Sequence, residues 1–231
     1  MNDEFAPQPS HAPQSAPAPQ SAPAPQSAPA PQPAPAPQPA QARRARSISP
    51  RLVRAMDTAA TAHDGQVRKG SGIPYVAHLF GVMHIASTVT DDEDVLIAAL
   101  LHDALEDVPD RYPEAAMRRD FGDRVTDIVV GVTKDASLGS WQDRADAYLR
   151  HLEHDAPDES VLVSACDKLH NLTSIFADHA NLGDGLWTRF NSGKERQQWW
   201  YAAIAGVVAR RLPHFPLNDE FTRLVAELQR I

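Results

Sequence analysis

The 231-residue chain has one cysteine, Cys166, so it cannot form an internal disulfide. A single thiol is typical of proteins in a reducing compartment, and we expect a cytoplasmic location. No run of about 18 apolar residues occurs, and no apolar stretch follows the acidic start MNDEF, so we expect neither a membrane span nor a signal peptide. The net charge of −8 argues against general binding to nucleic acid.

Large apolar and charged residues are almost missing from the first forty positions, which repeat Ala, Pro, Gln and Ser and hold most of the 20 prolines. Proline lacks the amide donor that helices and sheets need, and nothing here can form a core. We predict a disordered, extended tail over residues 1–45 and one folded domain over 46–231. The tail is either a spacer or a docking site for a proline-binding protein partner. The spacer is favoured, because no basic residue flanks a PxxP core in the repeat.

Beyond the tail, apolar residues recur with a period close to 3.6, which predicts an all-α domain. We expect Asp91 or Asp92 to cap the third helix. The Val-rich stretches 129–132 and 161–163 favour strands locally, but neither has an alternating partner. The predicted helices cover residues 50–63, 76–89, 92–108, 113–122, 123–134, 141–155, 160–181, 194–212 and 219–231.

The segment LLHDALEDV places a histidine and three acids on a stretch that its apolar residues mark for burial. His102 and Glu106 are four residues apart, as are Asp103 and Asp107, so on one helix each pair spans consecutive turns of one face. No lysine or arginine lies on this predicted helix. We therefore favour a bound metal over an ordinary solvated face.

Two further residues are candidate ligands. His78 follows a Gly-rich, basic loop, although a single histidine there is more often used for packing or capping. Asp167 interrupts the apolar run VLVSAC, with Asn171 one turn further on. A buried aspartate needs a partner, and a salt bridge to Lys168 or to a distant arginine is the alternative to a metal.

Four segments occur in order with ordinary spacing: TAHDGQVRKGSGIPYVAH, AALLHDALEDV, FGDRVTDIVVGVTK and SACDKLHNL. Together they resemble the hydrolase domain of RelA/SpoT-type enzymes, a branch of the HD-domain metal-dependent phosphohydrolases. The chain looks most like the single-domain small alarmone hydrolases. The resemblance runs from about Ser49 to about Leu212 and implies a single HD-domain helical bundle.

The resemblance also implies roles for the residues that match the motifs. The family's metal ligands, which hold one divalent ion and generally manganese, match His78, His102, Asp103 and Asp167. The Glu-Asp pair that positions or deprotonates the attacking water matches Glu106 and Asp107.

For the substrate, the resemblance implies an arginine stacked on the guanine base, a lysine near phosphate, and neighbouring polar groups. The matching or candidate residues are Arg68, Lys69, Ser71, Asn171, Ser174, Lys194, Arg196 and Tyr201. Trp199 and Trp200 are interpreted as packing residues. The sequence departs from the family pattern at three points: the basic loop is one residue longer than usual, Ile73 stands where an acidic residue is frequent, and Lys168 replaces the usual arginine. These departures bear on the preference for guanine and not on hydrolysis.

The implied activity is metal-dependent removal of pyrophosphate from the 3′ position of guanosine tetra- or pentaphosphate (ppGpp or pppGpp). The alternatives are another nucleotide phosphohydrolase, such as an NADPH 2′-phosphatase, or an alarmone-binding protein without turnover. We expect a small nucleotide as partner, with no nucleic acid and no membrane. Because the sequence ends at Ile231, we expect no synthetase domain, and the oligomeric state stays open.

Overall fold

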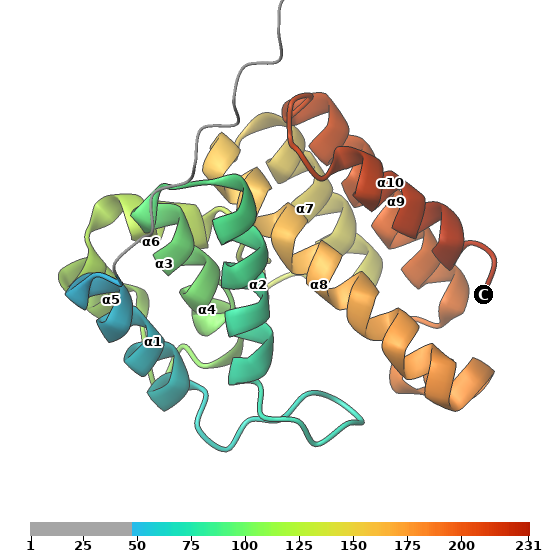
Figure 1. Ribbon diagram of the computed structural model, residues 1–231, viewed down its shortest axis with the longest axis horizontal. Helices are drawn as coiled ribbons and strands as arrows, with labels where there is room; N and C mark the ends of the chain where they lie inside the picture. The colour runs from blue at the N-terminus through green and yellow to red at the C-terminus, as the bar shows by residue number, and fades with distance from the viewer. Residues whose placement is uncertain (1–47) are drawn as a thin grey trace, which may run out of the picture. The chain divides into compact units, whose positions relative to one another are not determined.

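The computed structural model describes residues 48–231 as a bundle of helices (Figure 1). The prediction of an all-α fold is confirmed: residues 48–231 contain no strand, only an isolated bridge between Val67 and Pro74. The predicted disorder of the tail lies outside the described residues. The helices are α1 (Pro50–Ala62), α2 (Val76–Val89), α3 (Glu93–Leu101), α4 (Ala104–Asp107), α5 (Glu114–Phe121), α6 (Asp123–Val130), α7 (Trp141–His154), α8 (Asp158–Leu182), the 3-10 helix η1 (Gly183–Arg189), α9 (Lys194–Arg211) and α10 (Asn218–Leu228).

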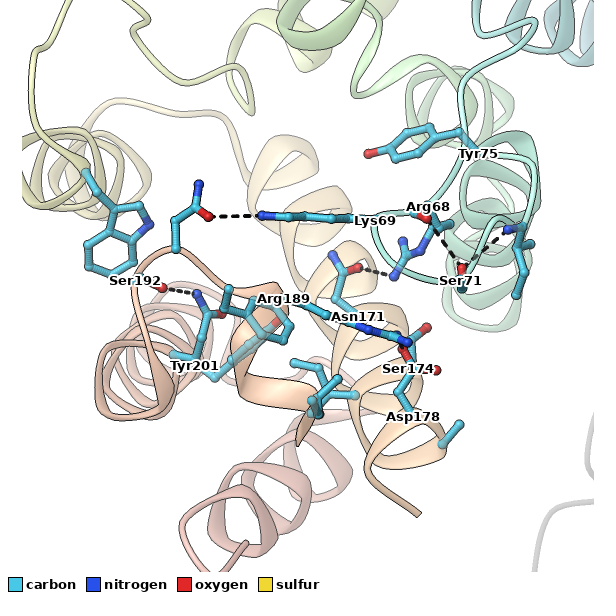
Figure 2. Close-up of a pocket in the computed structure, with 18 residues that line it drawn as sticks. Arg68, Lys69, Ser71, Tyr75, Asn171, Ser174, Asp178, Arg189, Ser192 and Tyr201 are labelled. Atoms are coloured by element: carbon cyan, nitrogen blue, oxygen red, sulfur yellow. Dashed lines mark hydrogen bonds and ion pairs between the residues drawn. The ribbon is translucent and has the colours of Figure 1, made fainter. Parts of the chain in front are cut away.

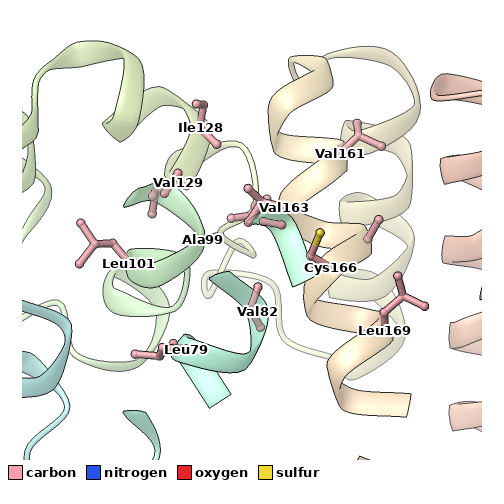
Figure 3. Packing of buried hydrophobic residues seen from close by; sticks show 14 of the residues in the cluster. Leu79, Val82, Ala99, Leu101, Ile128, Val129, Val161, Val163, Cys166 and Leu169 are labelled. Atoms are coloured by element: carbon pink, nitrogen blue, oxygen red, sulfur yellow. The ribbon is translucent and has the colours of Figure 1, made fainter. Parts of the chain in front are cut away.

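Helices α2, α3 and α8 form the centre of the bundle. Every residue of α3 from Val95 to Leu101 is buried, and α3 packs against α1, α2, α6 and α8. Figure 3 shows Leu79 and Val82 of α2 in the same buried apolar cluster as Val161, Val163 and Leu169 of α8, and the two helices pack against each other. The Val-rich stretch 161–163 lies in this buried part of α8, so its local strand preference yields to packing between helices. No helix among residues 48–231 is both long and apolar enough to cross a bilayer.

The predicted helix over 92–108 is wrong in one respect: it is two helices, α3 and α4, interrupted at His102 and Asp103. The physical reason lies in the His102 side chain. Its Nδ1 lies 2.9 Å from the carbonyl oxygen of Ala99, which in a continuous helix would accept the amide of Asp103. The argument from spacing along one helix face therefore fails, although the same residues stay close in space.

The capping prediction for the third helix is confirmed at Asp92, whose Oδ1 accepts from the amide of Asp94 at 3.0 Å. Asp92 Oδ2 also accepts from Arg124 at 2.6 Å, and this hydrogen bond is the main cause that lowers the pKa of Asp92.

We predict that Asp92→Ala lowers the free energy of unfolding by about 1 kcal/mol near pH 7, mostly through the lost cap, since half-exposed ion pairs add little. Because the pKa of Asp92 is lowered by folding, its contribution is present above the unfolded pKa of about 4 and is lost as the pH falls through the folded value. Urea unfolding at about pH 7 and about pH 3 measures this, with the exposed Asp110→Ala as control. An equal loss at both pH values would contradict the electrostatic part.

Candidate active site

The four predicted ligands come together from three parts of the bundle: α2, the α3–α4 junction and α8. His78, His102 and Asp103 each offer a ligand atom, and these atoms lie within 4.8 Å of one another, a group that can hold a metal ion. Asp103 Oδ2 lies 3.5 Å from His78 Nε2 and 3.0 Å from His102 Nε2. Asp167 Oδ1 approaches the same two nitrogens at 3.2 and 3.8 Å. Ligands bound at about 2.1 Å in tetrahedral or octahedral geometry are separated by similar distances.

The imidazole of His102 is held in the state that a metal ligand needs. Its Nδ1 donates to the Ala99 carbonyl, which leaves the lone pair on Nε2. His102 is 3% exposed, and among residues 48–231 its Nε2 has no hydrogen-bond partner of normal geometry. A buried nitrogen without a partner, directed at two carboxylates, fits a bound cation.

The electrostatics of the group also favour a positive charge at its centre. Burial lowers the pKa of His102, but the carboxylates of Asp103 and Asp167 outweigh it and raise the pKa to about 10. Burial opposes ionisation of Asp103, yet His102 and His78 hold the pKa of this carboxyl well below its ordinary value. The two carboxylates thus favour a positive charge at this group, and a divalent ion bound to Nε2 would supply that charge.

Asp167 contacts two residues that are close to it in the sequence, Lys168 and Asn171. Lys168 Nζ contacts Oδ2, as the salt-bridge interpretation predicts, and Asn171 Nδ2 donates to Oδ1 at 2.5 Å. Burial raises the pKa of Asp167, but Lys168 and then His102 bring it well below the ordinary value. The salt bridge does not exclude ligation, because it uses Oδ2 while Oδ1 faces the two histidines.

Glu106 and Asp107 lie beside this group, on α4. Glu106 is paired with Lys134, whose Nζ lies 3.2 Å from Oε1, so the cation missing from the helix itself comes from the segment after α6. Asp107 Oδ2 accepts from Gln66 at 2.8 Å. Burial and then the charge of Asp103 raise the pKa of Asp107, which makes this carboxylate a better proton acceptor.

A cavity of about 440 Å³ adjoins the group, within the size range of small-molecule sites (Figure 2). Tyr75 and Asn171 line this cavity and also contact two of the predicted ligands: Tyr75 donates to Asp103 Oδ2 at 2.7 Å, and Asn171 Nδ2 donates to Asp167. Six of the predicted substrate residues line this cavity: Arg68, Lys69, Ser71, Asn171, Ser174 and Tyr201.

Helix α8 forms one wall of the cavity. Asn171, Ser174 and Asp178 follow Asp167 at intervals of four, three and four residues, so they share one face that is about 16 Å long. Cations lie along this face: Arg68 donates to Asn171 Oδ1 at 3.0 Å and Arg189 to Asp178 Oδ2 at 2.9 Å. The cavity therefore runs from the four predicted ligands along a polar wall with positive charges beside it.

Two of the candidate substrate-binding residues, Lys194 and Arg196, do not line the cavity. Lys194 does not line it, since its Nζ lies 3.8 Å from Asp184 and 5.7 Å from the ring centre of Trp187. Arg196 is exposed and lies over Trp141 instead. Both sit on the first turn of α9, which faces η1 and α7, whereas Tyr201 lies further along α9 and faces the cavity.

Several residues of the site were missed by the sequence reasoning. Tyr75 stands three residues before His78, and a tyrosine hydroxyl so close to a candidate ligand was an available signal. Arg189 gave no signal, because the 3-10 helix η1 that carries it has no apolar periodicity. Lys134 contacts Glu106, and His170 contacts His78. Both contacts join residues that are far apart in the sequence, so no pattern in the sequence indicates them.

A His-Asp pair at the junction of two helices, completed by a histidine and an aspartate from neighbouring helices of an all-α bundle, defines the class of HD-type helical proteins. The family profile described as "HD domain" matches residues 55–185 of this chain. The chain belongs to the HD-domain family, which confirms the resemblance drawn from its motifs.

Within this family, the relatives carry specific names. A guanosine-3′,5′-bis(diphosphate) 3′-pyrophosphohydrolase of Danio rerio is 38% identical over 128 residues, covering 54% of this chain and 68% of that protein. The protein of the same name in Haemophilus influenzae is 34% identical over 122 residues, covering 51% of this chain but only 17% of the longer relative. A solved structure of a metazoan ortholog of SpoT, described as hydrolysing ppGpp, superposes with a TM-score of 0.62 at 27% identity, covering 80% of this chain and 97% of that one.

Proposed function

We propose that this protein is a metal-dependent hydrolase that removes pyrophosphate from the 3′ position of guanosine tetra- or pentaphosphate, leaving GDP or GTP. One observation carries the proposal: two histidines and two aspartates converge beside a cavity lined by Arg68, Lys69 and Arg189. The activity named for the relatives in Danio rerio and Haemophilus influenzae supports the same reaction.

In this proposal His78, His102, Asp103 and Asp167 hold the ion, and we propose manganese. A divalent ion held there would lower the pKa of a bound water and would supply positive charge for a phosphoryl oxygen. The mixed imidazole and carboxylate donors suit such an ion, and the unpartnered Nε2 of His102 supports its presence.

Glu106 or Asp107 accepts the proton of the attacking water. The water oxygen forms a bond to the phosphorus attached to O3′, the P–O3′ bond breaks, and O3′ takes up a proton. The raised pKa of Asp107 and its fixed hydrogen bond to Gln66 support this residue, and the pairing of Glu106 with Lys134 orients the second carboxylate.

Arg68, Lys69 and the polar face of α8 bind the nucleotide and align it for in-line attack. Arg68 presents a planar guanidinium that suits stacking on a base, and Lys69, whose Nζ lies 3.2 Å from Asn191 Oδ1, presents a compact charge for phosphate. Arg189 adds a third cation to the same cavity.

Product analysis tests the proposal. The purified protein is incubated with manganese and separately with ppGpp, pppGpp and NADPH, and the products are identified. Release of pyrophosphate together with GDP or GTP is expected, whereas orthophosphate from NADPH indicates a 2′-phosphatase. Equilibrium binding of ppGpp without turnover in manganese would overturn the hydrolase and indicate a binding protein.

The loop that carries Arg68 and Lys69 depends on Gly70. This residue has a φ of +80°, and a Cβ at this position would lie 2.5 Å from Arg189 Nε. Any side chain there therefore displaces either the loop or Arg189.

We predict that Gly70→Ala weakens substrate binding about tenfold, seen as a higher KM with kcat less affected, because the displaced cations contact the bound nucleotide. Steady-state kinetics with ppGpp measure this. Gly72→Ala is the matched control: it has a similar φ of +71° but nothing within 4 Å of the added Cβ. Equal effects of the two substitutions would show that backbone strain, and not the contact with Arg189, is responsible.

The cytoplasmic location and the absence of a nucleic-acid partner remain predictions from composition. The interpretation of the tail as a docking site for a protein partner involves residues outside those that the structure describes.

A further inference from the structure

His170 on α8 makes a contact that the proposed reaction does not use. Its Nδ1 lies 2.9 Å from Nδ1 of His78, and the two ring centres are 4.8 Å apart at an interplanar angle of 60°. His170 therefore binds the nitrogen of His78 that faces away from the carboxylates. The other nitrogen of His78, Nε2, is the one that lies 3.2 Å from Asp167 and 3.5 Å from Asp103.

The direction of this hydrogen bond follows from the chemistry of the ring. Of two neutral imidazole nitrogens in contact, one donates and the other accepts. A histidine that binds an ion through Nε2 carries its proton on Nδ1. His78 thus donates from Nδ1, and His170 accepts with the lone pair of its own Nδ1.

Gly81 on α2 makes room for this arrangement. It lies three residues after His78, and a Cβ at Gly81 would lie 2.2 Å from Cδ2 and 2.3 Å from Nε2 of His170. Glycine inside a helix is destabilising relative to alanine. A glycine inside α2 is explained by the imidazole of His170, which packs directly on the backbone of α2 at Gly81.

We propose that His170 is a positioning residue for the metal centre: it fixes the ring orientation and the Nδ1–H tautomer of His78, and Gly81 provides the space that this requires. The inference rests on the proposed function only in that an ion binds at His78. Its consequence is that metal affinity depends on a residue that is not itself a ligand.

Manganese binding to the full chain tests this without reference to turnover. The dissociation constant is measured by the loss of the free Mn²⁺ electron paramagnetic resonance signal. His170→Phe keeps a ring but loses the acceptor, and we expect about 10- to 100-fold weaker binding. His170→Asn places an acceptor oxygen near the lost Nδ1, and we expect it to restore most of the affinity.

The matched control is His179→Phe, a histidine on the same helix that packs near Trp187 and does not contact His78. Thermal melting in a chelator shows whether each apo protein is folded, so that weaker binding is separated from unfolding. His170→Phe with the affinity of the unchanged protein would overturn the proposal.

Gly81 gives a second, independent measurement. We expect Gly81→Ala to weaken manganese binding in the native background, because the added methyl displaces the imidazole, and to change it little in a His170→Ala background, where the clash is gone. An equal effect of Gly81→Ala in both backgrounds would contradict the role of Gly81. If the unchanged protein binds no manganese, the proposal of a metal centre is wrong. If the unchanged protein and the His170 variants bind manganese with the same dissociation constant, only the role of His170 is wrong.

Discussion

Replacing Asp103 by alanine is expected to abolish metal binding and turnover together. The Asp103 carboxylate contributes Oδ2 to the group formed with His78 and His102, and it also accepts the hydroxyl of Tyr75. Without it, two imidazoles and one aspartate remain, and the charge that attracts a divalent ion is halved. We expect manganese affinity to fall by more than about 100-fold, beyond the range for residues that only support a ligand.

The expected loss of turnover is at least about 10³-fold, the range for removing a principal source of transition-state stabilisation. Manganese titration and ppGpp hydrolysis measure the two effects on the same preparation. Asp110→Ala, an exposed aspartate shortly after α4, is the matched control and should leave both unchanged. An Asp103→Ala protein that binds manganese normally would remove Asp103 from the ligand set.

Replacing Glu106 by alanine is expected to separate the two properties: manganese binding is retained and turnover falls by about 10²- to 10⁴-fold, the contribution of a positioned general base. The reason is geometric. Glu106 lies one turn beyond the ligating group and is held by Lys134, not by the two histidines.

The measurement is kcat for ppGpp at saturating manganese, together with the manganese dissociation constant. Asp107→Asn is examined in parallel, since either carboxylate of the pair can serve as the base, and the variant with the larger loss of kcat identifies it. Glu153→Ala, whose carboxylate is paired with Arg210 on the surface, is the control. A Glu106→Ala enzyme with near-normal kcat, together with an inactive Asp107→Asn enzyme, would assign the base to Asp107 alone.

The helical architecture was predictable because its causes are local. The apolar period of 3.6 residues and the capping side chain of Asp92 act within one or two turns, and the structure places a helix start at Asp92. The order of the four motifs indicated the family, which the HD-domain match over residues 55–185 confirms.

The sequence failed where a residue's partner is distant along the chain. The interruption at His102 depends on a side chain competing for the Ala99 carbonyl, and the cation that pairs with Glu106 comes from Lys134, 28 residues away. Lys194 was a candidate for the substrate pocket, but the direction of the first turn of α9 places it beside Asp184.

The sequence by itself determined most of the helical segments and the motifs that they carry, because hydrophobic period, caps and motif order are properties of neighbouring residues. Only the tertiary structure decided which atoms meet: Nε2 of two histidines facing two carboxylates, His170 behind His78 in the space left by Gly81, and Arg189 beside Gly70. Such contacts join helices far apart in the chain, and their geometry follows from how the whole core packs.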